Sequence, residues 1–526
     1  MHLRQLIAQT ILVDRHLSLA DAVHVADGVS KIALTPSAIE RCGAAHARLA
    51  RLIAEQRHIY GITTGFGPLA NRLVDPAEGA MLQQNLVNHL ATGIGPHFSW
   101  RQARAIVLAR LMSILQGVSG ASLPTVNALV ALLNARFAPV IPSKGTVGAS
   151  GDLTPLAHMV LCFQGQGEFL LPDERRVPAT AALAEMALPA LDLSQRDGLA
   201  LVNGTSAMTG IAVLNALAMH RAIDWAVTLT AALAEVQSAR VEAWDAVFSE
   251  VRPHPGQQSI AEDLRARVQG SKRLKAGRLC DRRLLGLVPA TESLAGQDAY
   301  TLRCAPQIIG AVRDTAHWHD EIVVVELLSA TDNPIFPDAP EAFALHGGNF
   351  MGQHVGLASD ALANAVVVLA GLAERQVARV TDEALNQGLP AFLHRGAGGL
   401  NSGLMGAQVT ATALLAEARS IGPASVHSIS TNGANQDVVS MGTIAARHLS
   451  DKLTTLSQIQ AILALAVVQA MDILDLFDPD LGFSRSAQGL RRMVRALSPA
   501  LQTDRPLGRE IELLSHALTR TDPPDP

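Results

Sequence analysis

Four long apolar stretches limit what this chain can fold into more than any other feature. They cover residues 206–251, 353–383, 403–420 and 437–476. Small residues recur on their apolar faces, as at Ala358, Ala361 and Ala365, and they allow helices to approach closely. The 526-residue chain is 48% hydrophobic but only 3% aromatic, which favours Ala- and Leu-rich helices over aromatic cores. We therefore predict a mainly α fold built on a long-helix bundle.

The first part of the chain has a different pattern. Up to residue 202, shorter segments alternate with loops that contain glycine and proline, including 93–96 and 139–151, and some strand is expected between residues 11 and 34. We expect two regions: a smaller mixed N-terminal region at 1–202, and a region at 203–526 that holds the central bundle and the C-terminal helices.

Charge and cysteine usage exclude several classes of protein. The net charge of -5 gives no reason to expect a nucleic-acid partner. Cys42, Cys162, Cys280 and Cys304 are scattered without paired spacing, so neither a metal site nor a disulfide framework is predicted. A reducing, cytoplasmic location fits this usage.

Two further features argue against a membrane protein. Arg4, Asp14 and Arg15 leave no apolar core for a signal peptide. The most apolar run, residues 461–468, is flanked by glutamines and is well short of the ~20 apolar residues that a spanning helix needs. We expect no membrane partner.

A polar block stands just before each of three long apolar stretches. Asn203 precedes the stretch from 206, Phe350 ends a polar block before 353, and Asn432 lies before 437. If the three helices run parallel, their N-termini converge, and the positive ends of their dipoles form one electron-withdrawing pocket.

The tripeptide Ala149–Ser150–Gly151 lies in a run of small residues, GTVGASGDLTPLAH, at 145–158. If the Gly151 nitrogen attacks the Ala149 carbonyl, whose oxygen leaves as water, and Ser150 loses a second water, a five-membered ring with an electrophilic methylidene carbon results. Glycine supplies an unhindered nitrogen. The alternative is an ordinary Ser-Gly turn before a helix capped by Thr154 with Pro155 at its first position.

Further blocks extend along nearly the whole chain in a fixed order. They are YGITTGFGP at 60–68, LVNGTS at 201–206, QDAYTLR at 297–303, TDNP at 331–334, HGGNF at 346–350 and NGANQD at 432–437. Together with the tripeptide, they resemble the aromatic amino acid ammonia-lyases. The resemblance implies the long-helix fold of the ammonia-lyase/fumarase-aspartase superfamily, a homotetramer with composite active sites, and a 4-methylidene-imidazol-5-one formed autocatalytically from Ala149–Ser150–Gly151, without metal or nucleotide.

The resemblance also implies catalytic side chains. Tyr60 and Tyr300, the only two tyrosines in the chain, both fall in these blocks. Tyr60 matches the residue that removes the β-proton, and Tyr300 matches one that assists in proton handling. Arg303, three positions after Tyr300, would share its helical face and could grip a substrate carboxylate at two points; a surface ion pair is the alternative.

Other matched positions would bind the substrate or support the site. Asn203 and Asn333 match amides that hold the ring or the amino acid head group, although each could cap a helix or turn. Phe350 matches a pocket-lining position, with core packing as the alternative. The remaining implied positions are Asn432 and Gln436 in the pocket and Gly67, Asp152 and Leu153 in support.

Substrate choice is implied by His89–Leu90. In the family, this pair is His-Leu in tyrosine-type enzymes, Phe-Leu in phenylalanine types and Ser-His in histidine types. A histidine can hydrogen-bond a phenolic hydroxyl; the alternative is a histidine bonded to backbone within its helix. Histidine-type enzymes carry glutamate where this chain has Gln436, in agreement with the pair.

The resemblance thus implies an L-tyrosine ammonia-lyase that yields trans-p-coumarate, with weaker activity on L-phenylalanine. The ring would either add the substrate amine or attack the aromatic ring, and the sequence does not choose between them. Alternatives on the same scaffold are a tyrosine 2,3-aminomutase and a histidine or phenylalanine ammonia-lyase. A helical scaffold with a dead site is a third class, disfavoured by the intact tripeptide, both tyrosines and Arg303.

Overall fold

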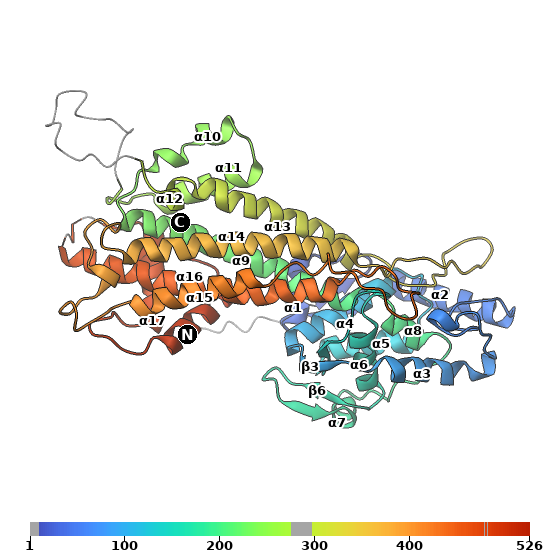
Figure 1. The fold of residues 1–526 in the computed structure, drawn as a ribbon. Helices are drawn as coiled ribbons and strands as arrows, with labels where there is room; N and C mark the ends of the chain where they lie inside the picture. Colours follow the sequence, from blue (N-terminus) through green and yellow to red (C-terminus); the bar gives the residue numbers. More distant parts are fainter. Residues whose placement is uncertain (1–9, 275–296, 478, 481) are drawn as a thin grey trace. The chain divides into compact units, whose positions relative to one another are not determined.

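The structure, a computed structural model, describes residues 10–274, 297–477, 479–480 and 482–526 (Figure 1). The chain forms two compact units. The first comprises residues 1–217, 318–360 and 423–450, and the second comprises 218–317, 361–422 and 451–526. The boundary expected between 202 and 203 lies inside the first unit, and the division into those two regions stays a prediction.

The first unit holds the short elements of the N-terminal half. These are β1 (Thr10–Val13), α1 (Leu19–Ala26), β2 (Lys31–Leu34), α2 (Pro36–Ala54), η1 (Gly67–Leu69), η2 (Pro76–Glu78), α3 (Gly79–Leu90), β3 (Ile94–His97), α4 (Trp100–Leu115), α5 (Leu123–Asn134), β4 (Ala138–Pro139), β5 (Pro142–Lys144), α6 (Leu153–Phe163), β6 (Glu168–Leu170), β7 (Arg176–Pro178), α7 (Ala179–Glu185) and α8 (Asp197–Val202). The strand expected near the N-terminus is confirmed, since β1 and β2 pair in parallel. β3 pairs with β5, and β4, β6 and β7 form an antiparallel sheet.

Four long helices have residues in both units. They are α9 (Ser206–Val236), α13 (Ala305–Leu327), α14 (Gln353–Thr381) and α16 (Gly442–Phe477). α9 is buried along almost its whole length, as expected of a helix that is apolar on every side. The predicted long helices are confirmed, with corrected ends.

The second unit adds shorter helices to its part of the long ones. They are η3 (Val241–Trp244), α10 (Ala246–Glu250), α11 (Pro255–Arg267), α12 (Tyr300–Arg303), η4 (Ala391–Leu393), α15 (Met405–Ser420), α17 (Arg485–Leu497) and α18 (Gly508–Arg520). Buried polar bonds join α9 to its neighbours here. Gln376 Nε2 on α14 donates to Thr230 Oγ1 at 2.9 Å, and Gln460 Nε2 on α16 donates to the Ala222 carbonyl at 2.8 Å.

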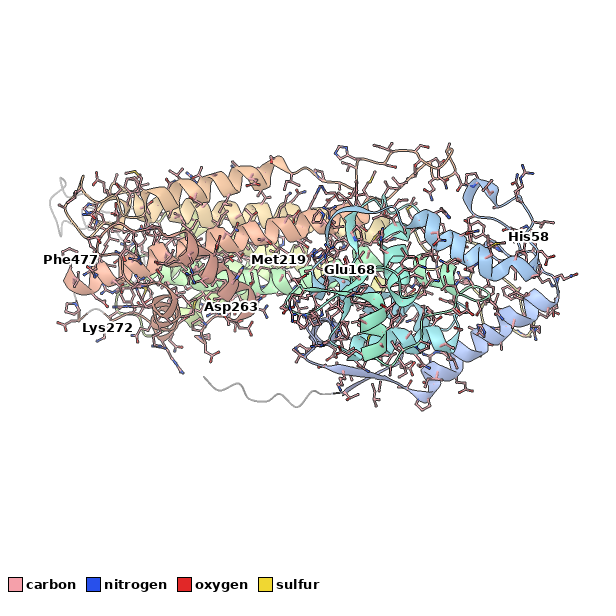
Figure 2. All side chains as sticks on the ribbon, turned by 90° about the horizontal axis from the view of Figure 1, so that it is seen from below. His58, Glu168, Met219, Asp263, Lys272 and Phe477 are labelled. Atoms are coloured by element: carbon pink, nitrogen blue, oxygen red, sulfur yellow. The ribbon has the colours of Figure 1, made fainter. Side chains whose placement is uncertain are left out.

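Two of the described helices, α14 and α16, are long and apolar enough to cross a membrane by length and composition alone. However, 67% and 83% of their most apolar windows are buried, as expected of core helices. Phe477, at the C-terminal end of α16, is by contrast 74% exposed (Figure 2).

Two expected helix ends, at residues 251 and 437, were wrong. The helix expected to reach 251 ends at Val236 because Ser238 adopts a left-handed conformation and the Ala239 N–H closes back onto the Ala234 carbonyl. The helix expected from 437 begins at Gly442, after a loop in which Asn432 and Met441 also have positive φ.

The helix after the tripeptide begins earlier than in the alternative interpretation as an ordinary Ser-Gly turn. α6 begins at Leu153, with Asp152 at its N-cap, so neither Thr154 nor Pro155 marks its start. Pro155 is tolerated in the first turn because the N–H groups of a first turn have no partner within the helix.

Candidate active site

The tripeptide Ala149–Ser150–Gly151 lies in the first unit, in the loop between β5 and α6. Gly148 and Gly151 have φ values of +70° and +66°. A Cβ on Gly151 would collide with the Gly204 carbonyl oxygen, and one on Gly148 would collide with Ser440 Oγ. Both positions therefore require glycine, for close approach as well as for backbone conformation. The backbone turns sharply enough that Ala149 pairs with Gly151.

The N-terminal ends of α9, α14 and α16 meet beside this loop. A Cβ on Gly352 or on Gly442 would overlap the sulfur of Met208, in the first turn of α9. A Cβ on Gly148 would lie 3.3 Å from the Gly442 nitrogen. The predicted convergence of three helix N-termini is thus confirmed, and their partial positive charges gather next to the tripeptide.

Asp152, directly after the tripeptide, links two of these N-termini. Its Oδ2 accepts a hydrogen bond from the Met208 N–H at 2.8 Å, and its Oδ1 accepts from the hydroxyls of Thr443 and Thr146. The side chain is fully buried, and this burial raises the pKa of the Asp152 carboxyl from 3.8 to about 6, against the hydrogen bonds, which lower it. Asp152 therefore fixes the end of the tripeptide to α9 and α16.

The other side of the tripeptide is held by the loop before α16. Gln436 Nε2 donates to the Ser150 hydroxyl at 3.1 Å, and Ser440 Oγ donates to the Gly148 carbonyl at 3.0 Å. Ala149 packs in a small apolar cluster with Val439 and Met441. The structure thus brings Gln436 and Ser150 together, as the sequence predicted for a shared site.

Tyr60 and Gly67 form a second part of the site in the same unit. The Gly67 N–H donates to the Tyr60 phenol oxygen at 2.9 Å, and the Tyr60 N–H donates to His346 Nε2 at 3.2 Å. Phe66 packs edge-on against the Tyr60 ring, with centroids 6.1 Å apart. A Cβ on Gly67 would lie 2.9 Å from Asn432 Nδ2, so Asn432 lies against this loop.

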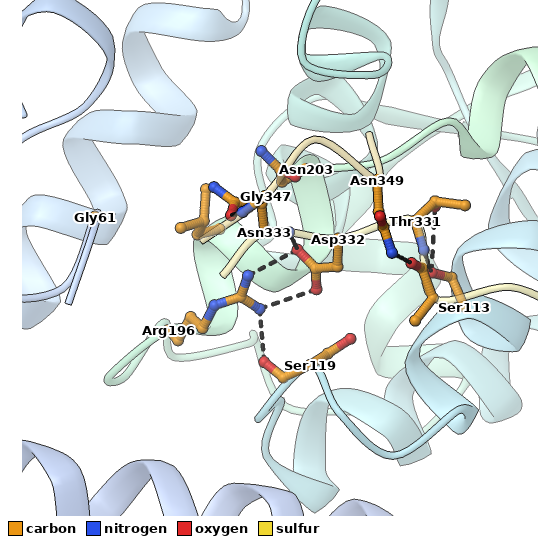
Figure 3. Close-up of polar contacts among 12 residues, drawn as sticks. Gly61, Ser113, Ser119, Arg196, Asn203, Thr331, Asp332, Asn333, Gly347 and Asn349 are labelled. Atoms are coloured by element: carbon orange, nitrogen blue, oxygen red, sulfur yellow. Dashed lines mark hydrogen bonds and ion pairs between the residues drawn. The ribbon is translucent and has the colours of Figure 1, made fainter. Parts of the chain in front are cut away.

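Asn203 and Asn333 lie around a buried charged network (Figure 3). Arg110 donates to the Asn203 carbonyl, and the Asn333 side-chain oxygen accepts from the Gly347 N–H at 2.7 Å. Arg196 and Asp332 form a bidentate ion pair in which both side chains are fully buried. Arg196 Nη2 donates to Asp332 Oδ1 at 2.7 Å, and Nη1 donates to Oδ2 at 3.0 Å.

The Asn203 amide is placed to meet a ligand. Asn203 is 4% exposed, and within the described part of the chain its side-chain oxygen has no hydrogen-bond partner. A buried polar atom left in this way costs free energy, so such atoms often belong to binding sites. The amide oxygen of Asn203 is therefore a candidate acceptor for an N–H or O–H group of a ligand.

Sequence reasoning missed the two arginines of this network. Arg110 lies in α4 among apolar residues that extend from Ala105 to Met112, and Arg196 precedes α8. A charged residue within this apolar run was the available signal for Arg110, because burial requires a partner. Nothing local signalled that both would gather near Asp332.

His89 and Leu90 are the last two residues of α3. His89 Nδ1 lies 2.9 Å from the Asn85 carbonyl one turn earlier, which is the backbone bond expected under the alternative. The His89 side chain is exposed, and Leu90 is half-buried against the core. A substrate contact by His89 would therefore use Nε2.

Leu153 and Phe350 both lie next to the helix N-termini in the chain. Leu153 is the first residue of α6, and Phe350 stands three residues before α14. Both are half-buried, so the full core packing considered for Phe350 is not observed.

Tyr300 and Arg303 belong to the second unit and are described apart from the other site residues. They lie on one short helix, α12, as predicted, and the Arg303 guanidinium carbon lies 4.8 Å from the Tyr300 ring centroid. Both line a pocket of about 550 Å³, together with Arg240 and Gln307. Tyr300 is 67% exposed.

Comparison with known proteins agrees with this geometry. The model of the family described as "Aromatic amino acid lyase" matches residues 17–498, and the chain belongs to that family of carbon–nitrogen lyases. It is 58% identical to a tyrosine ammonia-lyase of Cereibacter sphaeroides, over 97% of this chain and 98% of the relative. It is 42% identical to an MIO-dependent tyrosine 2,3-aminomutase of Streptomyces globisporus, over 89% and 87%.

The fold is also found in solved structures. The crystal structure of a tyrosine aminomutase from Streptomyces globisporus matches with a TM-score of 0.91 at 37% identity, covering 97% of each chain. The predicted mainly α, long-helix fold of the ammonia-lyase superfamily is therefore confirmed.

Proposed function

We propose that the protein is an L-tyrosine ammonia-lyase, which eliminates ammonia without oxidation to give trans-p-coumarate. The observation that carries this proposal is the position of the tripeptide beside three helix N-termini, where Gly148 and Gly151 leave no room for a side chain. The chain is also 58% identical to a tyrosine ammonia-lyase. Weaker activity on L-phenylalanine is expected, because the two substrates differ only by the phenolic hydroxyl.

The tripeptide suits cyclisation to 4-methylidene-imidazol-5-one. The turn pairs Ala149 with Gly151, and Gly151 can lie against Gly204 only because it has no Cβ. Once formed, the ring would supply an electrophilic methylidene carbon that activates the substrate for loss of its amine. Asp152 and Asn203 would hold it, with the helix N-termini withdrawing electron density.

Proton transfer is proposed for the two tyrosines. Tyr60 removes the β-proton, and the Gly67 N–H that donates to its phenol oxygen stabilises negative charge on that oxygen. Tyr300 assists in handling the proton. Arg303 binds the substrate carboxylate bidentately, because its planar guanidinium matches two carboxylate oxygens.

Binding of the rest of the substrate is assigned to the remaining residues. Asn203 and Asn333 hold the ring or the amino acid head group. The pocket wall is assigned to Leu90, Phe350, Asn432 and Gln436, with Gly67 and Leu153 in support. His89 is proposed to hydrogen-bond the phenolic hydroxyl through Nε2.

We further propose a cytoplasmic homotetramer whose active sites draw residues from more than one copy. Exposed apolar side chains on the long helices, such as Val325 on α13 and Val368 on α14, favour assembly. The proposed partners are small-molecule substrates only. Light scattering tests the assembly, and a fully active monomer would contradict it.

A second candidate is a tyrosine 2,3-aminomutase, favoured by the 42% identical relative and by the matching solved structure. The same residues would then return the amine to the β-carbon. The deciding experiment incubates the protein with tyrosine, phenylalanine and histidine in parallel and identifies products by mass and ultraviolet absorbance.

In that experiment we expect p-coumarate from tyrosine as the main product, and no product from a Ser150→Ala control. β-Tyrosine as the main product would assign the aminomutase instead. No product from any of the three substrates would overturn the proposed function.

A further inference from the structure

The side chain of Gln83 connects two elements that carry proposed site residues. Gln83 lies on α3 and is completely buried. Its Nε2 donates to the Gly61 carbonyl at 2.9 Å, and its Oε1 accepts from the Leu199 N–H at 2.8 Å. One amide therefore satisfies two buried backbone groups, at Gly61 and Leu199, that are far apart in the chain.

The first of these groups belongs to the loop of the proposed base. Gly61 directly follows Tyr60 and has a φ of +69°. A Cβ on Gly61 would lie 2.6 Å from Phe66 Cε1 and 2.8 Å from Leu199 Cδ2, so the loop packs tightly on both neighbours. The bond from Gln83 fixes the Gly61 carbonyl in this packed position.

The second group belongs to the helix that ends at Asn203. The Leu199 N–H is held by Gln83, while the Leu199 carbonyl accepts from the Asn203 N–H at 2.9 Å. Gly198 lies so close that a Cβ there would be 3.0 Å from Gln83 Oε1. Hydrogen bonds thus run without a break from Gly61, through Gln83 and Leu199, to the backbone of Asn203.

We propose that Gln83 is a positioning residue that sets the place of Tyr60 relative to Asn203. This inference rests on the proposed function, in which Tyr60 takes the β-proton and Asn203 holds the ring or head group. An amide is suited to the task because it presents one donor and one acceptor at a fixed spacing. A small displacement of a catalytic group is enough to lower the rate of the chemical step.

Gln83→Met tests the proposal because it keeps length and volume but has no donor for the Gly61 carbonyl and only a weak sulfur acceptor for the Leu199 N–H. We expect kcat for tyrosine to fall by roughly ten- to a hundredfold, with KM changed far less. The near-UV absorbance of the ring should stay at the wild-type level.

The matched control is Gln84→Met, one position along the same helix. Gln84 bonds Asn88 at 3.0 Å and Gln164, and neither partner belongs to the proposed site. This variant should keep wild-type kcat and KM. If it loses as much kcat as Gln83→Met, the effect belongs to α3 as a whole and the proposal is overturned.

A double-mutant cycle separates positioning from general support of the fold. If Gln83 acts through Tyr60, then Gln83→Met should cause less than about a twofold further loss of kcat in a Tyr60→Phe background. A full additional loss would mean that Gln83 acts independently of Tyr60, and it would overturn the proposal.

Should Gln83→Met not fold, Gln83→Asn takes its place in the cycle, since its shorter amide can reach only one of the two partners at a time. A smaller loss with the same coupling to Tyr60 supports the proposal, and wild-type kcat overturns it. Neither result bears on the proposed function, which instead fails if the wild-type protein makes no product.

Discussion

The proposed site residues have opposite surroundings in the two units. In the first unit, Asp152 and Asn203 are buried, and backbone and side-chain hydrogen bonds fix them within the chain. In the second unit, Tyr300 is 67% exposed and Arg303 lies over its ring at the wall of an open pocket. Within a single chain, the residues beside the tripeptide are therefore fixed by hydrogen bonds to their own chain, whereas Tyr300 and Arg303 are left open at a pocket wall.

The strongest test of the first group is Ser150→Ala, which removes the hydroxyl that must leave during cyclisation. The variant should fold and assemble but have no near-UV ring absorbance and no detectable elimination. Intact mass provides the second measurement: the native chain should be two waters lighter than its sequence mass. A native mass equal to that of the unmodified chain would contradict the ring.

Tyr60→Phe tests whether the first unit also supplies the base. The phenol takes no part in backbone cyclisation, so the ring absorbance should be unchanged while elimination falls by at least ~10²-fold. Steady-state rates and absorbance on the same preparation measure both. Near-wild-type elimination would transfer the base to Tyr300 and so to the other unit.

Asp152→Asn tests whether burial in the first unit raises the pKa of Asp152. The Thr443 and Thr146 hydroxyls can accept from the new amide, so the variant should fold. Because the folded-state pKa of Asp152 is raised, its contribution to stability is complete below pH ~4 and is lost as pH rises through about 6. The unfolding free energy of wild type relative to the variant should fall by about 3 kcal/mol over that window.

Denaturant unfolding of both proteins between pH 4 and pH 7 measures this difference. Other titrating groups are common to the two chains and cancel in the comparison. A difference that does not change with pH would mean that Asp152 titrates as an ordinary exposed carboxyl.

His89→Phe tests a site residue that lies in the first unit but is exposed, as Tyr300 is in the second unit. Leaving the substrate phenol without a partner costs about 1 to 3 kcal/mol, so kcat/KM for tyrosine should drop roughly ten- to a hundredfold. Phenylalanine should hold or improve. Measuring both substrates on both proteins decides the question: an unchanged ratio means that His89 does not face the substrate ring.

Arg303→Lys tests the second unit directly and carries the smallest expected effect. Charge is kept, but an ammonium cannot make the planar two-point contact. Loss of about 1.5 kcal/mol corresponds to roughly a tenfold lower kcat/KM. An unchanged kcat/KM for the lysine variant would contradict bidentate binding. The substrate carboxylate would then be bound by charge alone or by another residue.

The parts of the molecule that the sequence predicted are those encoded by local pattern. Apolar periodicity located α9, α14, α15 and α16, and polar blocks before three of them predicted that their N-termini converge. Local spacing also placed Tyr300 and Arg303 on one helix. The roles of all these residues in the reaction stay predictions.

The parts that sequence reasoning missed depend on distant pairing or on backbone conformation. Arg196 and Asp332 are 136 positions apart, and no periodicity connects them. The start of α16 was misplaced because Met441, directly before it, takes a left-handed conformation that a methionine side chain does not favour. His89 Nδ1 contacts the Asn85 carbonyl within its own helix. The resemblance of the His89–Leu90 pair to the family gave no information about this local contact.

The contact of Met208 with Gly352 and Gly442 has a consequence for how related sequences can diverge. One thioether occupies the volume that side chains at the two glycines would need. A side chain at either glycine therefore forces the Met208 thioether to move or to be replaced by a smaller residue. We expect substitutions at these three positions, which lie in distant parts of the chain, to be tolerated better in compensating pairs than singly.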